Sequence, residues 1–165
     1  MPDRPNFIAH WSKLEHAKGH IYKGDSEEMG LDAAIGEKLG LTRIGIHHVR
    51  LKPGQRTSYP HAESAEEEFA FVIEGRPDAW IDGELHALAP GDSVAFPAGT
   101  GISHTFLNNT ADEVRLLVIG EKPKDENRIR YPLHQAHEAT RPDRWLNPPA
   151  RPRGPHDGKA RAGSK

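Results

Sequence analysis

The stretch from Pro53 to Gly75, PGQRTSYPHAESAEEEFAFVIEG, limits what this chain can fold into more than any other segment. It places a histidine and a group of carboxylates directly before the apolar run Phe69–Ile73. The acidic residues are Glu63, Glu66, Glu67 and Glu68. The apolar run predicts a strand that is buried on both faces. A carboxylate that leads into such a strand must reach water, find a partner or bind a metal ion.

The rest of the chain predicts an all-β fold. Gly and Pro recur at short intervals, and the segments between them predict strands over residues 42–51, 69–73, 79–81, 84–88, 93–96, 104–107 and 114–119. Asp82-Gly83 suits a two-residue hairpin turn. A short helix is expected only over residues 32–39, ended by Gly40. Many short strands with so little helix indicate a sandwich or barrel.

Charge and proline divide the 165 residues into unlike parts. The net charge is −2, but residues 121–165 carry eleven Lys/Arg against six Asp/Glu, together with seven of the fourteen prolines. We therefore predict an N-terminal arm over residues 1–41, one β-barrel domain over 42–120, an extension packed on the barrel over 121–146, and a flexible tail over 147–165. Residues 128–131 could add an edge strand.

Several classes of function find no support in the sequence. The chain has no cysteine, which excludes disulfides and thiolate ligands. It has no signal-peptide-like start and no apolar run of membrane-spanning length, so we expect a cytoplasmic protein without a membrane partner. Phosphate-binding loops and the GxSxG elbow are absent. Nucleic acid is not an expected partner, because the basic tail contains Trp145 but no interleaved aromatic pattern.

Four side chains form a candidate metal site. His61 and Glu63 are two positions apart, so an extended backbone would direct both to one face. Imidazole and carboxylate groups together suit first-row divalent metals. Glu68 could add a third ligand and His104, at the start of another predicted strand, a fourth. The alternative is a solvated acidic loop and a histidine that merely begins a strand.

Two segments resemble the sequence motifs of the cupin family. The first motif, G(X)5HXH(X)3–4E(X)6G, is similar to residues 54–75, and the second, G(X)5PXG(X)2H(X)3N, is similar to residues 91–108. With the hairpin between them they cover residues 42–120. The resemblance implies a double-stranded β-helix, or jelly-roll barrel, with a metal ion inside its mouth. The implied ligands are His61, Glu68 and His104.

The chain departs from the cupin pattern at three points. Gly54 lies seven residues before His61, and four residues rather than two separate Gly99 from His104. Both are changes of loop length. The third departure changes the chemistry, because Glu63 stands where the family has its second histidine. Two neutral histidines and two carboxylates would balance a divalent cation. Without metal, Glu63 and Glu68 would repel each other and one would take up a proton.

These observations predict a homodimeric cupin that binds a divalent metal (Fe, Mn, Zn or Ni) and a small polar organic molecule. If it is an enzyme, dioxygenase, isomerase or lyase chemistry is open to it, with Glu63 as fourth ligand or as general base. The alternative is a non-catalytic module that binds or senses a sugar or organic acid, in which Glu63 grips the ligand. A third, weaker reading is a nucleic-acid or partner-protein adaptor that acts through the basic tail.

Neighbouring side chains receive secondary predictions. His47 and His48 are adjacent on one strand, so only one can face the barrel interior. Tyr59 could line the rim of the pocket. Arg56 is expected to be a solvated loop residue, with an anionic ligand as the alternative. Residues predicted for the core or a dimer interface are Phe69, Phe71, Trp80 and Phe106.

Overall fold

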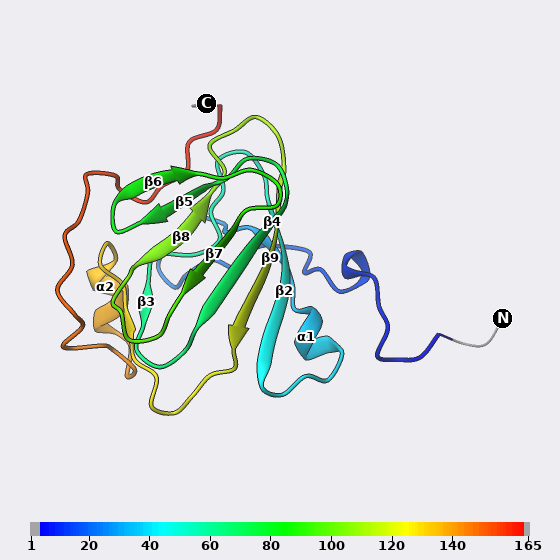
Figure 1. Ribbon diagram of the computed structural model, residues 1–165, viewed down its shortest axis with the longest axis horizontal. Coiled ribbons are helices and arrows are strands. Elements are labelled where there is room, and N and C mark those ends of the chain that lie inside the picture. The colour runs from blue at the N-terminus through cyan, green and yellow to red at the C-terminus, as the bar shows by residue number, and fades with distance from the viewer. Residues whose placement is uncertain (1–3, 164–165) are drawn as a thin grey trace.

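The computed structural model describes residues 4–163 and confirms an all-β fold with few short helices (Figure 1). The strands are β1 (Leu31–Ala33), β2 (Ile44–Leu51), β3 (Ala62–Glu63), β4 (Glu68–Glu74), β5 (Asp78–Ile81), β6 (Glu84–Ala87), β7 (Ser93–Phe96), β8 (His104–Leu107), β9 (Val114–Glu121) and β10 (Ile129–Arg130). The helices are the 3-10 turn η1 (Trp11–Lys13) and the short α1 (Ile35–Lys38) and α2 (Gln135–Ala139).

The strands form three antiparallel sheets. The largest has the order β1-β2-β9-β4-β7, and the second has the order β6-β5-β8. The third is the pair β10-β3, which attaches the predicted edge strand near residues 128–131 to the barrel. The order brings β2 beside β9 and β4 beside β9, although these strands are far apart in the sequence. This non-local pairing matches the jelly-roll arrangement.

The core lies between the five-stranded and three-stranded sheets. Its members come from alternate positions of the strands, because successive side chains point to opposite faces. They are Val49, Leu51, Ala70, Val72, Ala79, Phe96, Phe106, Val114 and Leu116. Phe106 is therefore a core residue, as predicted. Phe69 and Phe71 alternate with these positions and lie half-exposed on the outer face of β4.

The hairpin predicted at Asp82-Gly83 is confirmed. β5 pairs with β6 from Asp78–Ala87 to Ile81–Glu84, and the two turn residues have φ angles of 47° and 93°. Both angles are positive, as the tight turns that match strand twist require.

The helix predicted over residues 32–39 is wrong in its first half. Leu31–Ala33 forms the edge strand β1, paired with residues 48–50 of β2, and the helix is reduced to Ile35–Lys38. Strand pairing satisfies the backbone groups of residues 31–33 better than one helical turn interrupted by Gly36 could do. The predicted stop at Gly40 is present, with a φ of 89°.

Residues 147–163 of the tail have neither helix nor strand, yet they lie along the barrel instead of leaving it. The backbone N–H of Gly154 donates to the carbonyl of Asp82 at 2.7 Å, and the indole Nε1 of Trp80 donates to the carbonyl of His156 at 3.0 Å. Figure 1 shows this segment, orange to red, passing outside β5 and β6. A flexible tail was expected from composition, and these contacts give the segment a defined path.

The tail also contacts Arg56, which is fully buried rather than solvated. Its guanidinium donates to both carboxylate oxygens of Glu27 at 2.7 and 2.8 Å and to the carbonyl of Gly158 at 2.8 Å. Arg56 thus joins the N-terminal arm, the barrel and the tail. Within residues 4–163, no helix is long and apolar enough to cross a membrane.

Candidate metal centre

Three of the four predicted ligands converge in the structure. Glu68 is the first residue of β4, His104 is the first residue of β8, and His61 forms an isolated bridge with His104 just before β3. One ligand atom from each lies within 4.8 Å of the others. We call these three residues the metal cluster. They come from three separate strand ends, so only the folded barrel assembles them.

Both histidine rings of the metal cluster contact neighbouring groups that orient them. The Nδ1 of His61 lies 2.9 Å from the carbonyl of Tyr59, so a proton on Nδ1 donates there and leaves Nε2 free as a ligand. The Nε2 of His104 lies 3.1 Å from Glu68 Oε1. Phe96 stacks on the His104 ring with 3.5 Å between centroids. These contacts orient both rings before any ion binds.

The electrostatics of the cluster suit a cation. Burial lowers the pKa of His61, and the nearby charge of His104 lowers it further, so His61 favours the neutral form that binds metals. Burial alone would raise the pKa of Glu68, but the hydrogen bond from His104 and the charge of His104 outweigh it and lower that pKa. Glu68 therefore stays ionised.

The donor set also fits a divalent ion by size. Metal–ligand distances of about 2.1 Å place bound donor atoms roughly 3–4 Å apart. The His104–Glu68 pair already has such a separation, and the full group stays within 4.8 Å. Two imidazoles and one carboxylate suit Mn²⁺, Fe²⁺, Zn²⁺ or Ni²⁺, without selecting among them.

Glu63, the fourth predicted ligand, lies outside the group of three. It lines a small cavity together with Glu68 and His104. Burial raises its pKa to about 8, with further contributions from the charges of Glu66 and Glu68. This matches the expectation that one carboxylate of the Glu63–Glu68 pair takes up a proton when no metal is present. The roles of fourth ligand and of general base stay predictions.

A larger cavity of about 520 Å³ adjoins the metal cluster on another side, and we call it the mouth cavity. His61 and Glu68 line it, together with residues of the inner face of β2 and of the N-terminal arm. Its other polar and titratable members are His16, Lys18, His20, Tyr22, Asp32, His47, Thr57 and Ser58. An apolar wall is formed by Met29, Val49, Phe106 and Val118.

Of the adjacent histidines, His47 faces the mouth cavity and His48 faces away. His47 Nδ1 lies 2.9 Å from Asp32 Oδ1. His48 is buried against Trp11, with stacked rings 4.1 Å apart. The alternation of β2 predicts that only one of the two can face inward, but not which one. Asp32 carried no signal, because the segment around it was predicted as helix.

Tyr59 does not line the mouth cavity, where the sequence suggested that it could lie at the rim. It is 4% exposed and stacks between Tyr22 and His134, at 3.8 and 3.6 Å. Its contribution to the site is its carbonyl oxygen, which orients His61. The residues from the N-terminal arm that line the cavity were also missed, since nothing in a loop sequence shows which barrel end it will cover.

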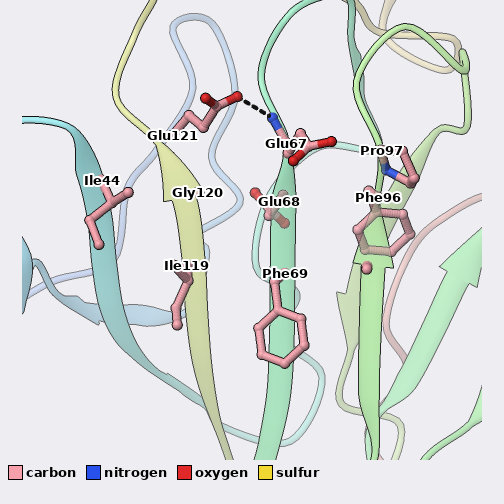
Figure 2. A pocket seen from close by; sticks show the side chains of 10 residues that line it. Ile44, Glu67, Glu68, Phe69, Phe96, Pro97, Ile119, Gly120 and Glu121 are labelled. Atoms are coloured by element: carbon pink, nitrogen blue, oxygen red, sulfur yellow. Dashed lines mark hydrogen bonds between the residues drawn. The ribbon is translucent and has the colours of Figure 1, made fainter.

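A third cavity of about 260 Å³ lies on the outer face of the five-stranded sheet. Figure 2 shows Ile44 on β2, Ile119 on β9 and Phe69 on β4 side by side in this groove. Glu68 also reaches it from the start of β4. Exposed apolar groups continue along the face at Ile73, which is 44% exposed. This is the surface that the sequence offered as core or dimer interface.

Comparison with known proteins gives the family. Residues 47–120 match the model described as a cupin domain. A sugar phosphate isomerase of the cupin superfamily from Silicibacter pomeroyi is 30% identical, with 68% of this chain and 81% of that chain covered and a TM-score of 0.59. A structure from Acidithiobacillus ferrooxidans, provisionally described as a sugar phosphate isomerase, has a TM-score of 0.68 at 23% identity, over 77% of this chain and 81% of its own.

A further relative has a different description. Polyketide synthase CurC from Streptomyces cyaneus is 28% identical over 136 residues, which are 73% of this chain and 83% of that protein. The motifs, the jelly-roll topology and the His61–Glu68–His104 cluster agree with these matches. The chain belongs to the cupin superfamily.

Proposed function

We propose that this protein is a metal-dependent enzyme that moves a proton next to the carbonyl group of a small, polyoxygenated substrate. The reaction class is enolisation, of which aldose–ketose isomerisation is the simplest complete example. The observation that carries the proposal is the shared cavity: two members of the metal cluster and eight further polar or titratable residues line one space of about 520 Å³.

The character of the mouth cavity supports this substrate class. Hydroxyl and carbonyl groups need hydrogen-bond partners when they leave water, and the lining of His16, Lys18, Asp32 and Ser58 supplies donors and acceptors. Val49 and Phe106 form the apolar part of the wall, against which a carbon skeleton can pack. The volume lies within the usual range for small-molecule sites.

The relatives point to the same chemistry from two directions. One is described as a sugar phosphate isomerase and another as a polyketide synthase. Sugar phosphates and polyketide chains share a carbonyl group beside a carbon that carries an acidic proton. Proton transfer at that carbon is therefore the reaction step common to both descriptions, and it supports enolisation over oxygen chemistry.

The residues of the site have different roles in the proposed reaction. His61, Glu68 and His104 would hold the metal, which supplies Lewis-acid polarisation of a bound carbonyl. Tyr59 and Phe96 hold the two rings in place. Glu63, which shares a small cavity with Glu68 and His104, is the residue we propose as fourth ligand or as a base beside the ion. The arm covers the substrate and limits the access of water.

The test begins with metal. We expect purified protein to bind about one equivalent of Mn²⁺, Fe²⁺, Zn²⁺ or Ni²⁺ by elemental analysis and calorimetry, and His61→Ala or His104→Ala to abolish it. His86→Ala is the matched control, because His86 is exposed on β6 far from the cluster in the sheet order. A metal-free wild type that stays unchanged on titration with all four ions would contradict the proposal.

Turnover is tested next with a panel of sugar phosphates and β-keto compounds. The expected result is metal-dependent isomerisation or deuterium uptake from ²H₂O at the carbon beside the carbonyl. Thermal stabilisation by a compound of the panel, without product or exchange, would instead support the non-catalytic binding module. In that case the metal cluster would serve recognition alone.

We also propose that the protein is a homodimer. Phe69, Phe71, Leu117 and Ile119 present half-exposed apolar side chains on the outer face of one sheet, with Ile44 and Ile73 more than 40% exposed beside them. Contiguous apolar patches of this kind mark protein interfaces. A second copy of the same face would cover it by twofold symmetry.

A further inference from the structure

A histidine–aspartate pair that has no role in the metal cluster lines the mouth cavity. Asp32 on β1 and His47 on β2 are diagonal neighbours across two antiparallel strands, because Asp32 pairs with Val49 in the register. Their side chains meet at 2.9 Å, between His47 Nδ1 and Asp32 Oδ1. Both line the cavity that His61 and Glu68 also line. The pair and two members of the metal cluster therefore line one cavity.

The second ring nitrogen of His47 is available for chemistry. Among residues 4–163, the side chain of His47 has no hydrogen bond besides the one to Asp32. Gly45 is the next residue of β2 on the same face, and a Cβ atom there would lie 3.1 Å from His47 Nε2. Glycine at this position thus leaves room beside Nε2. A hydrogen bond on Nδ1 fixes the proton on that nitrogen and makes Nε2 the proton acceptor.

The charges around His47 suit a base that must also hold a proton. The hydrogen bond to Asp32 raises the pKa of His47, and the negative charges of Asp32 and of Glu68 on β4 raise it further. Burial and the positive charge of Lys122, which follows β9, act in the opposite direction and lower that pKa. From the arm, His16, Lys18 and His20 also face the cavity. His47 is 38% exposed and Asp32 34%, so solvent and substrate can reach the pair.

A structural role alone leaves features unexplained. β1 is already held to β2 by three paired residues, and His16 N–H donates to the Asp32 carbonyl at 2.9 Å. A pair that served only to hold β1 against β2 could equally lie on the outer face of the sheet, where Arg50 already forms ion pairs with Glu15 and Glu113. Instead the pair lies inside the cavity, with the free nitrogen next to a glycine.

We infer that His47 is the proton-transfer residue of the proposed enolisation and that Asp32 is its positioning residue. This inference rests on the proposed function. His47 Nε2 removes the proton from the carbon beside the substrate carbonyl, the C–H electron pair forms a carbon–carbon double bond, and the carbonyl π pair moves to oxygen. The resulting enediolate then takes the proton from His47 Nε2 at the neighbouring carbon. The hydroxyl proton on the carbon that was first deprotonated passes to the alkoxide oxygen of the former carbonyl, and a C=O double bond forms at the carbon that it leaves. Hydroxyl and carbonyl thus exchange places, and no oxidant or reductant is needed.

The experiment follows proton exchange directly. Wild-type protein loaded with Mn²⁺ is incubated in ²H₂O with one of four probes: glucose 6-phosphate, fructose 6-phosphate, ribose 5-phosphate or acetoacetyl-N-acetylcysteamine. Mn²⁺ is then removed by chelation, and the loss of the signal of the proton on the carbon beside the carbonyl is measured by NMR. We expect His47→Gln to lower the exchange rate about 100-fold or more, and Asp32→Asn about tenfold or more. The acidic limb of the Asp32→Asn pH profile should shift to lower pH, because the pair raises the pKa of His47.

His48→Gln is the matched control, since it changes the adjacent histidine on the opposite face of β2. Its exchange rate should stay within about threefold of wild type. Gly45→Ala keeps both members of the pair but crowds Nε2, and we expect it to lower exchange without loss of metal binding. It provides a second variant if His47→Gln does not fold.

One readout needs no turnover. In metal-free protein, the imidazole titration of His47 followed by ¹H–¹⁵N NMR should move to lower pH in Asp32→Asn. Suppose that wild type exchanges the substrate proton, and that folded, metal-loaded His47→Gln exchanges it at a rate within about threefold of wild type. The inferred role of the His47–Asp32 pair is then overturned, while the proposed function stands. If wild type shows no exchange with any probe, the proposed function fails and the pair with it.

Discussion

Glu63→Gln in metal-free protein is the sharpest test of the electrostatics of the site. Burial and the charges of Glu66 and Glu68 raise the pKa of Glu63 from 4.5 to about 8. Between these two values the unfolded state has lost the proton and the folded state still holds it. Stability must therefore fall as pH rises from 4.5 to 8 and change little above that range on account of this group.

The magnitude follows from the same numbers. Each pH unit over which only the folded state is protonated is worth about 1.4 kcal/mol, so the roughly 2.5 units between 4.5 and pH 7 give about 3 kcal/mol. Partial exposure reduces this to about 2 kcal/mol. Glutamine has nearly the same shape and cannot ionise. We therefore expect Glu63→Gln to be more stable than wild type by about 2 kcal/mol at pH 7 and by less than about 1 kcal/mol at pH 5.

The assay is urea unfolding of chelator-treated protein at pH 5, 6, 7 and 8. Glu67→Gln serves as control, because Glu67 is exposed and its backbone N–H, not its carboxylate, bonds to Glu121. Equal stability of Glu63→Gln and wild type across this range would refute the reasoning, since it would mean that Glu63 is fully solvated. The same curves in saturating Mn²⁺ should lose the difference or reverse it, because a nearby cation favours the ionised carboxylate.

Three further predictions concern the barrel and its surface. Phe69→Glu should convert a wild-type dimer to a monomer in light scattering, whereas His86→Glu on the exposed strand β6 of the other sheet should not; a monomeric wild type would remove the dimer proposal. Gly83→Ala should lower the free energy of unfolding in urea by about 2–4 kcal/mol, because the new Cβ would lie 2.4 Å from the carbonyl oxygen of Gly154. The control is Gly91→Ala, where φ is similarly positive but the space is open, and it should lower that free energy by about 1 kcal/mol. Equal losses would mean that the tail does not lie on the turn. Deleting residues 147–165 should lower the melting temperature by several degrees and increase the exposure of Trp80 to a fluorescence quencher; unchanged values would contradict the docked tail.

The strands of the barrel could be predicted because their signals are local. Phe69–Ile73 and the Asp82-Gly83 turn each specify their structure through adjacent residues, and both are present at the expected places. Leu31–Ala33 could not be predicted as a strand, since its conformation depends on pairing with β2. The path of the tail depends likewise on distant groups such as Trp80, which composition cannot show.

The residues of the candidate site also fall into those that the sequence could predict and those that it could not. His61, Glu68 and His104 could be placed together because two motifs fix their positions relative to the strands. Asp32 could not, because its role arises only where β1 meets β2. Residues of the arm that line the mouth cavity were missed for the same reason. Contacts between an irregular segment and a barrel end leave no periodic pattern in the sequence.

Glu68 is the residue that connects the two halves of the site. It lines the small cavity with Glu63 and His104 and also the mouth cavity with His47 and Asp32. Glu63 does not line the mouth cavity, so the carboxylate in place of the second cupin histidine lies beside the metal cluster and outside the cavity that we propose for the substrate. In the proposed reaction, the proton transfer that we infer for His47 takes place on the side of the mouth cavity. Glu63→Gln should accordingly change metal affinity and metal-free stability, while His47→Gln changes proton exchange, and the two effects should be separable in one double mutant.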